Sequence, residues 1–207
     1  MSQRQELINY LNGDSQADQA RVHLAAQGPA VIPQLLEALL DVLKALGRYA
    51  ATQVNSFDAE NKMDLAAGRA WQLISAVASV SPQNSAAAAD CLIQGIRSSN
   101  PNIRALAAQL GTAEGIESET YLRTVAQCFV NDSDYLPKMA AAIFLAGVTD
   151  GSDQVTQMAR GLASDWINQY AERKYRFLVQ KSAHIDDEWG RKMVIGTGAV
   201  YREIART

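Results

Sequence analysis

The side chains best suited to catalysis or metal binding are few and far apart. His184 and Glu188 lie four residues apart, so on a helix they would share one face, as two ligands of one metal ion must. One imidazole and one carboxylate do not complete a site, and His23 is distant in sequence. Neither histidine belongs to a recognisable nucleophile or zinc motif. We therefore predict surface or capping roles for both histidines, with no metal and no catalytic residue.

The cysteines and one glycine pair add little support for an enzyme. Cys91 and Cys128 are predicted to be free thiols in a reducing compartment, with a disulfide as the alternative. Gly196-Thr197-Gly198 lacks the preceding strand and the third glycine of a dinucleotide-binding loop. The sequence therefore predicts no cofactor.

Acidic residues gather in three predicted turns, where they resemble metal sites. The spacing of a calcium loop is absent, and carboxylates near helix starts can accept hydrogen bonds from exposed backbone amides. We interpret these clusters as helix caps: Glu114, Glu117 and Glu119; Asp132 and Asp134; Asp150 and Asp153.

A repeated helix pair must position any functional side chains. Between Pro101 and Ala163 one apolar pattern occurs twice, offset by 33 residues, with the i, i+3, i+4, i+7 spacing of a helix face. A shared period of this length is typical of stacked helical repeats. The first helices match Ile103, Leu106, Leu110 and Ala113 with Leu136, Met139, Ile143 and Ala146. The second helices match Leu122, Val125, Ala126 and Phe129 with Val155, Met158, Ala159 and Leu162.

Two further copies precede this pair. The same offset gives Leu73, Val77 and Val80, followed by Ala89, Leu92, Ile93 and Ile96. A second-helix face at Ile32, Leu35, Leu36 and Leu39 lies 57 residues before the one that starts at Ala89, so about 24 residues are inserted. Because the apolar stripe continues through Leu43 and Leu46, we predict a long helical hairpin over residues 40–66, with a mobile insert as the alternative.

The composition fits helices better than strands. The 207 residues are 48% hydrophobic but only 7% aromatic, which favours Ala- and Leu-rich helices. We predict an all-α, right-handed α-solenoid over residues 1–164, whose first helix runs from Ser2 to Leu11 and stops at Asn12-Gly13. Residues 165–207 are predicted to form a divergent helical cap packed on the solenoid. Its first helix is predicted to start at Ser164 and its last to run from Ile185 to Ala205, with 192–196 extended as the alternative.

Charge and hydropathy narrow the classes of partner. The net charge is −3 and the isoelectric point is near 5.4, which argues against a dedicated nucleic-acid binder. Residues 1–164 carry eleven Lys/Arg against sixteen Asp/Glu, and residues 165–207 carry eight against six, which suits either a solvated tail or a basic docking surface. The polar start MSQRQELINYL and the absence of a long apolar run predict a cytoplasmic protein with no membrane span.

Polar residues recur at equivalent positions of the predicted second helices. Stacking would place them in rows across one surface, which solenoids use to bind extended partners. The alternative is that they are only solvated helix positions. The predicted partner-binding residues are Glu37, Gln94, Gln127 and Arg160 in one row, and Asp90 and Arg123, followed by Thr156, in the next.

The segments PAVIPQLLEALL, NPNIRALAAQL and DSDYLPKMAAAIFLAG resemble HEAT repeats, in particular the bacterial phycobilisome-lyase type. The resemblance covers residues 14–163 and rests on Pro29, Asn102, Arg104 and Ala107-Ala108. It departs from the pattern at Trp71, where an Arg is common, and in the inserted residues. It implies scaffolds, adaptors and assembly chaperones, and in some members bilin attachment or removal. A divergent branch excises alkylated DNA bases, but no catalytic residue of these enzymes aligns with this sequence.

Three functional hypotheses follow from the sequence. The first is a non-catalytic scaffold, adaptor or assembly chaperone that grips a protein partner along its second-helix surface. The second is a bilin lyase or lyase chaperone, for which Trp71, Trp166 and Trp189 would line a pocket. The third, nucleic-acid binding, would require the Lys and Arg residues of 165–207 to lie on one concave face.

Overall fold

The described part of the chain is entirely helical where it is regular. The computed structural model describes residues 2–13, 16–52, 57–116, 118–147, 157 and 161–169, and none of these residues lies in a strand. The all-α prediction is therefore confirmed for this part. The helices are α1 (Gln3–Asn12), α2 (Ala17–Ala25), α3 (Val31–Thr52), α4 (Phe57–Ala78), α5 (Pro82–Ile96), α6 (Pro101–Leu110), α7 (Glu119–Asn131) and α8 (Tyr135–Gly147), with a short 3-10 turn, η1 (Gly28–Ala30), before α3. Residues 161–169 are also helical.

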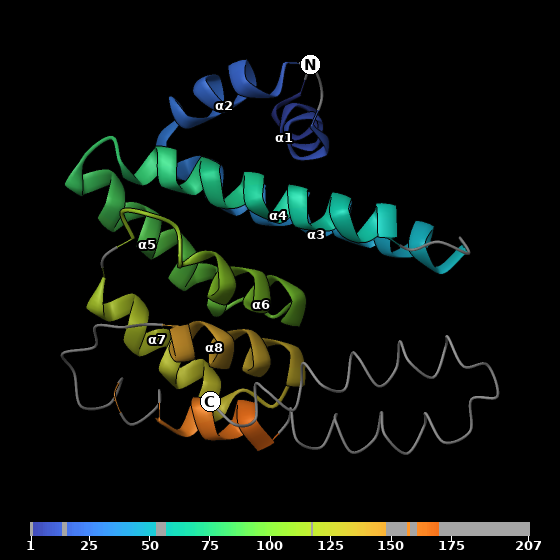
Figure 1. Cartoon of the computed structure of the whole chain (residues 1–207). Coiled ribbons are helices and arrows are strands. Elements are labelled where there is room, and N and C mark those ends of the chain that lie inside the picture. Colours follow the sequence, from blue (N-terminus) through green and yellow to red (C-terminus); the bar gives the residue numbers. More distant parts are fainter. Residues whose placement is uncertain are drawn as a thin grey trace.

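The helices lie in layers that follow the order of the sequence. Figure 1 shows α1 and α2 at one end, then α3 with α4, α5 with α6, α7 with α8, and residues 161–169 at the other end. Helices α5 and α6 contact each other, as do α7 and α8, and each pair is joined by only a few residues, which favours antiparallel neighbours. The repeat units predicted from the sequence paired α6 with α7 instead. Each of these structural pairs therefore contains helices from two predicted units.

Helices α3 and α4 are the longest described and continue through the residues that interrupt the repeat. Each has 22 residues. The end at which α3 stops and α4 starts projects past the other described layers (Figure 1). None of the described helices combines the length and the apolar character needed to cross a membrane.

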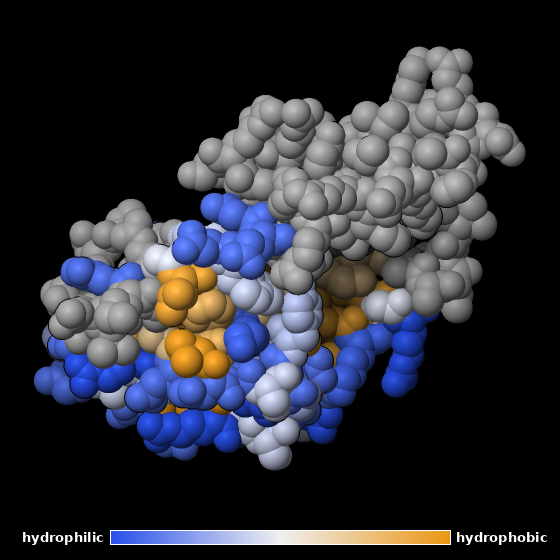
Figure 2. All heavy atoms as spheres, turned by 90° about the horizontal axis from the view of Figure 1, so that it is seen from below, coloured by the Kyte–Doolittle hydropathy of each residue, from blue (hydrophilic) through white to orange (hydrophobic). Residues whose placement is uncertain are grey.

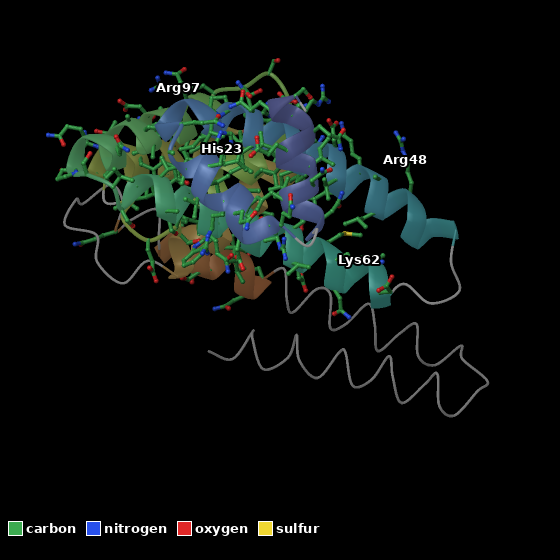
Figure 3. The ribbon with its side chains drawn as sticks, turned by 90° about the horizontal axis from the view of Figure 1, so that it is seen from above. His23, Arg48, Lys62 and Arg97 are labelled. Carbon is green, nitrogen blue, oxygen red and sulfur yellow. The ribbon has the colours of Figure 1, made fainter. Side chains whose placement is uncertain are left out.

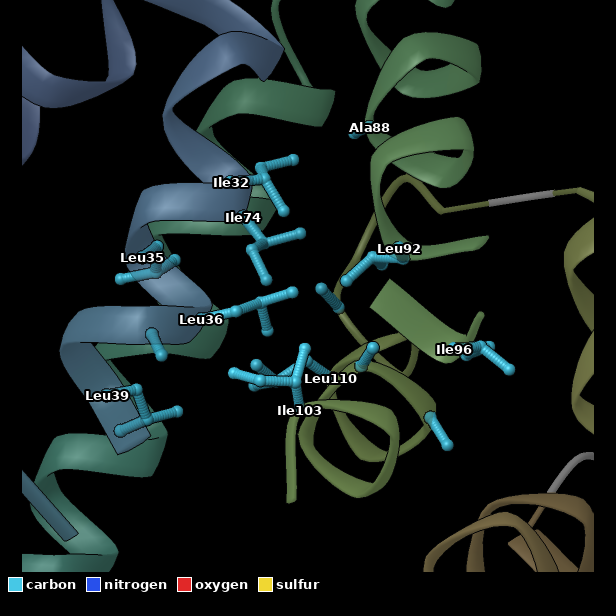
Figure 4. Close-up of a cluster of buried hydrophobic side chains, with 14 of the residues drawn as sticks. Ile32, Leu35, Leu36, Leu39, Ile74, Ala88, Leu92, Ile96, Ile103 and Leu110 are labelled. Carbon is cyan, nitrogen blue, oxygen red and sulfur yellow. The ribbon is translucent and has the colours of Figure 1, made fainter. Parts of the chain in front are cut away.

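The core lies between the layers and is built from short aliphatic side chains. Figure 4 shows residues from α3, α4, α5 and α6 pointing toward one another. The positions predicted to face inward on the second helices are buried on α3 and α5, and Val125, Ala126 and Phe129 are buried on α7. Each helix therefore uses an i, i+3, i+4, i+7 stripe to cover its neighbour. The labelled core residues are Ile32, Leu35, Leu36, Leu39, Ile74, Ala88, Leu92, Ile96, Ile103 and Leu110.

Local capping defines several helix ends. Ser81 and Ser118 accept hydrogen bonds from the backbone N–H groups of Asn84 and Tyr121, at 3.1 and 3.2 Å, as helix N-caps do. Gly13 has φ +85° after α1, which confirms the predicted left-handed stop there.

One expectation about the C-terminal helices is wrong, and another is not tested. Ser164 does not start a helix, because residues 161–169 are helical on both sides of it. Ala163, Trp166 and Ile167 all pack toward the core, so one face continues through the serine. The last predicted helix, at 185–205, lies outside the described residues.

Four positions predicted to be in the core are exposed, among them Leu162 in the helical residues 161–169, at 55%. Val80 is 65% exposed because α4 ends two residues earlier, at Ala78. Leu136 and Ile143 on α8 are 43% and 55% exposed, although the equivalent Ile103 and Leu110 on α6 are buried. One face of α8 therefore carries apolar side chains that the described helices leave partly uncovered.

Candidate partner-binding surfaces

Five of the predicted partner-binding residues are exposed on α3, α5 and α7, and we call this set the polar ridge. Helix α5 contacts both α3 and α7. Positions that are equivalent in the repeat therefore lie on the outer faces of three successive, touching helices. Arg160 and Thr156 lie outside the described residues. The polar ridge consists of Glu37 on α3, Asp90 and Gln94 on α5, and Arg123 and Gln127 on α7.

The charges on the polar ridge are mixed and solvated. Arg123 Nη2 lies 3.4 Å from Glu119 Oε1, one helical turn away, and the two side chains are 51% and 63% exposed. A pair this exposed contributes little to stability. Changes of charge on the ridge should therefore alter recognition more than folding.

A second surface, the apolar groove, lies between α3, α6 and α8. It encloses about 420 Å³, and its described lining contains one charged side chain, Lys44, and two amides, Asn102 and Gln109. An apolar hollow with few polar groups is typical of a binding site. The remaining lining residues are Leu40, Leu43, Ala105, Leu106, Leu136, Met139, Ala140 and Ile143.

The apolar groove was not predicted as a site. Its residues follow the helical apolar pattern, so the sequence indicated burial for Leu136 and Ile143. Figure 2, seen from the α7–α8 end, shows apolar side chains gathered among hydrophilic ones on that face. The pattern identified which residues share a face but not whether another element covers it.

Arg104 fastens the start of α6 to the turn between α7 and α8. Its Nε and Nη2 donate to the two carboxylate oxygens of Asp132 at 2.7 and 3.0 Å, and Nη2 also donates to Asp134 at 2.5 Å. Nη1 donates to the carbonyl of Ser98 at 3.0 Å. The hydrogen bond from Arg104 lowers the pKa of Asp132. Asp132 Oδ1 also accepts a hydrogen bond from the backbone N–H of Asp134 at 2.9 Å, so Asp132 binds an exposed amide before α8, as predicted, and Arg104 as well.

Both cysteines are free thiols, as predicted, and both are poor nucleophiles. Burial raises the pKa of Cys91, and it raises that of Cys128 to about 11. Cys91 Sγ donates to the carbonyl of Pro29 at 3.4 Å, and Cys128 Sγ donates to Asp132 at 3.7 Å. Both side chains therefore stay protonated near neutral pH, whereas the thiolate is the reactive form.

Within the described ranges, no group of three His, Cys, Asp or Glu side chains is arranged to hold a metal ion. His23 lies on the surface of α2, as Figure 3 shows, and its Nδ1 is 2.7 Å from Glu6 Oε1. That contact is consistent with the predicted surface role. His184, Glu188 and the Gly196–Gly198 segment fall outside the described residues.

Comparison with known proteins gives no match: no family model matches the sequence, and no curated protein or solved structure matches the chain. The resemblance to HEAT repeats stays a prediction from the sequence.

Proposed function

We propose that this chain is a non-catalytic scaffold, a right-handed solenoid of helical repeats that binds a protein partner along the polar ridge. One observation carries the proposal. The repeat-equivalent pairs Asp90/Arg123 and Gln94/Gln127 are exposed on two helices that contact each other, as rows along one outer surface would require. The layered order of the helices in Figure 1 supports the solenoid.

The chemistry of the polar ridge suits a polypeptide. Amide side chains such as those of Gln94 and Gln127 both donate and accept hydrogen bonds, as a peptide backbone requires. The ridge also presents carboxylates at Glu37 and Asp90 beside one guanidinium at Arg123. Phosphate recognition needs an excess of cations, so this mixture favours protein over nucleic acid.

A charge exchange on the ridge tests the proposal. We expect the full-length D90R/R123E variant to retain at least about tenfold less of its partner from a native lysate than the unchanged chain, because misplaced like charges oppose docking. The melting temperature should be unchanged, since both residues are exposed.

Arg48→Glu is the matched control, because Arg48 is exposed on the projecting part of α3, away from the ridge (Figure 3). This variant should retain the partner normally. Equal retention by all three chains would refute binding through the ridge, and a lowered melting temperature of D90R/R123E would mark these residues as structural.

The bilin hypothesis has only the repeat resemblance as its support. An absorbance titration of the chain with a bilin tests it directly. An unchanged bilin spectrum at saturating protein would dismiss it.

A further inference from the structure

Part of the apolar groove is exposed, so another polypeptide segment can pack against it. Successive layers cover each other's apolar stripes, yet Leu136 and Ile143 remain 43% and 55% exposed at its α8 wall. Covering apolar surface yields roughly 25 cal/mol per Å². The bound position of a segment that packs apolar side chains against this surface is therefore stabilised by the burial.

The described chain ends beside one end of the apolar groove. The ring of Trp166 lies 5.7 Å, centroid to centroid, from Tyr135, the first residue of α8, and 6.2 Å from Phe129. Leu136, the next residue of α8, lines the groove. Trp166 therefore places the helical residues 161–169 beside the start of the α8 wall.

The sequence of residues 170–207 suits this groove in length and chemistry. The α8 wall from Leu136 to Ile143 is about 10 Å long at a rise of 1.5 Å per helical residue, so a small part of the segment is enough to cover it. Residues 165–207 carry a net positive charge and residues 1–164 a net negative one, so the two parts attract each other. The apolar residues of the segment include Phe177, Leu178, Val179, Ile185, Trp189, Met193, Val194 and Ile195.

We propose that residues 170–207 of the same chain dock in the apolar groove between α3, α6 and α8. Tethering favours this occupant over a separate molecule, because a linked segment is present at an effective concentration in the millimolar range. The proposal is independent of the function proposed above, since the polar ridge and the groove consist of different residues.

Photocrosslinking in the full chain tests the docking. We expect p-benzoylphenylalanine at position 143 to crosslink to peptides from 170–207 while the protein still migrates as a monomer. The same probe at position 22 on α2 is the control, because Val22 is also an exposed apolar residue, at 68% against 55% for Ile143, and α2 lies at the opposite end of the layers (Figure 1). The control should give no such crosslink.

Each other occupant has its own result, and each would overturn the proposal. A crosslinked dimer would identify a second copy of the chain in the groove. Crosslinks confined to residues 1–169, or none at all, would show that 170–207 lies elsewhere.

A polar substitution gives a second readout. We expect Ile143→Asp to make trypsin cleave after Arg173 or Lys174 at least about tenfold faster than in the unchanged chain, because a carboxylate in the groove weakens docking. Val22→Asp is the control for a charge on an exposed apolar site, and it should leave cleavage unchanged. Equal cleavage rates in all three chains would contradict docking in the groove.

Discussion

Tyr121 joins α7 to α6 through one buried hydroxyl. Its Oη lies 2.8 Å from the carbonyl oxygen of Ala107 and 2.9 Å from that of Ala108. The ring packs edge-on against Phe144 of α8, with 5.5 Å between centroids. A methyl group on Gly111 would lie only 2.1 Å from this ring. The backbone at Gly111 has φ −71°, which any residue can adopt. A glycine is needed there only because the Tyr121 ring leaves no room for a side chain.

We predict that Gly111→Ala destabilises the protein by about 1 to 3 kcal/mol, the usual effect of overpacking a core. The loss should shrink when Tyr121 is also replaced by Ala, because the clash is then removed. Urea denaturation of the two single variants and the double variant measures the coupling. If Gly111→Ala costs the same free energy in both backgrounds, the ring is not its cause.

Asp132 should make stability depend on acidic pH. Its pKa is lowered by Arg104, so its contribution is present above the ordinary carboxyl value of about 3.9 and is lost as the pH falls through the lower folded value. We expect Asp132→Asn to cost about 2 kcal/mol at pH 7. The variant should also lose less stability than the unchanged chain between pH 4 and pH 2, measured by denaturation at each pH.

The exposed pair of Asp58 and Lys62 supplies the control. Its side chains are 61% and 55% exposed, so Asp58→Asn should change the unfolding free energy by less than about 0.5 kcal/mol. If Asp132→Asn and Asp58→Asn change the unfolding free energy equally, the burial of the Arg104–Asp132 pair does not explain its contribution to stability.

Single residues were predictable where their contacts are local. Ser81 and Ser118 bind amides three residues away, so a contact of this kind depends only on the sequence of the turn itself. Arg104 and Asp132 are 28 residues apart, and only the packing of α6 against α8 brings them together. The resemblance singled out Arg104 but gave no partner for it.

At the scale of the helices, Gly95 and Gly68 have opposite roles. A methyl group on Gly95 would lie 2.7 Å from Cβ of Ala107 and 2.9 Å from Cδ1 of Leu36, where α5 crosses α6 and α3. A methyl group on Gly68 of α4 would meet no atom within 4 Å.

The same substitution should therefore change stability in opposite directions. We predict that Gly95→Ala destabilises the protein by about 1 to 3 kcal/mol through overpacking. Gly68→Ala should stabilise it by about 0.5 to 1 kcal/mol, because alanine favours the helix. Thermal unfolding of the two variants beside the unchanged chain tests the pair. A rise in melting temperature for Gly95→Ala would show that α5 can move away from its neighbours.

Helix type and phase were predictable, but coverage was not. The stripes at Leu35 and Leu92 turned out buried because neighbouring helices carry matching stripes. The stripe at Leu136 and Ile143 has the same periodicity and is exposed. Periodicity reports which residues share a face, whereas burial depends on whether a partner face exists.

At the scale of the whole molecule, the layers follow the chain, and each described layer contacts mainly the next. The all-helical class could be predicted from the composition and from the 33-residue period of the sequence. The apolar groove could not be predicted, because it is formed by α3, which is longer than α6 and α8, and by α8 lying beside α6.

The unequal burial of the two thiols gives a chemical measure of how the layers open. Cys128 of α7 is buried, so an alkylating reagent reaches its sulfur only when α7 opens. Cys91 of α5 is partly buried, so it reacts without such an opening and serves as the internal reference. The rate of Cys128 alkylation relative to that of Cys91 therefore reports how often the layer of α7 and α8 opens.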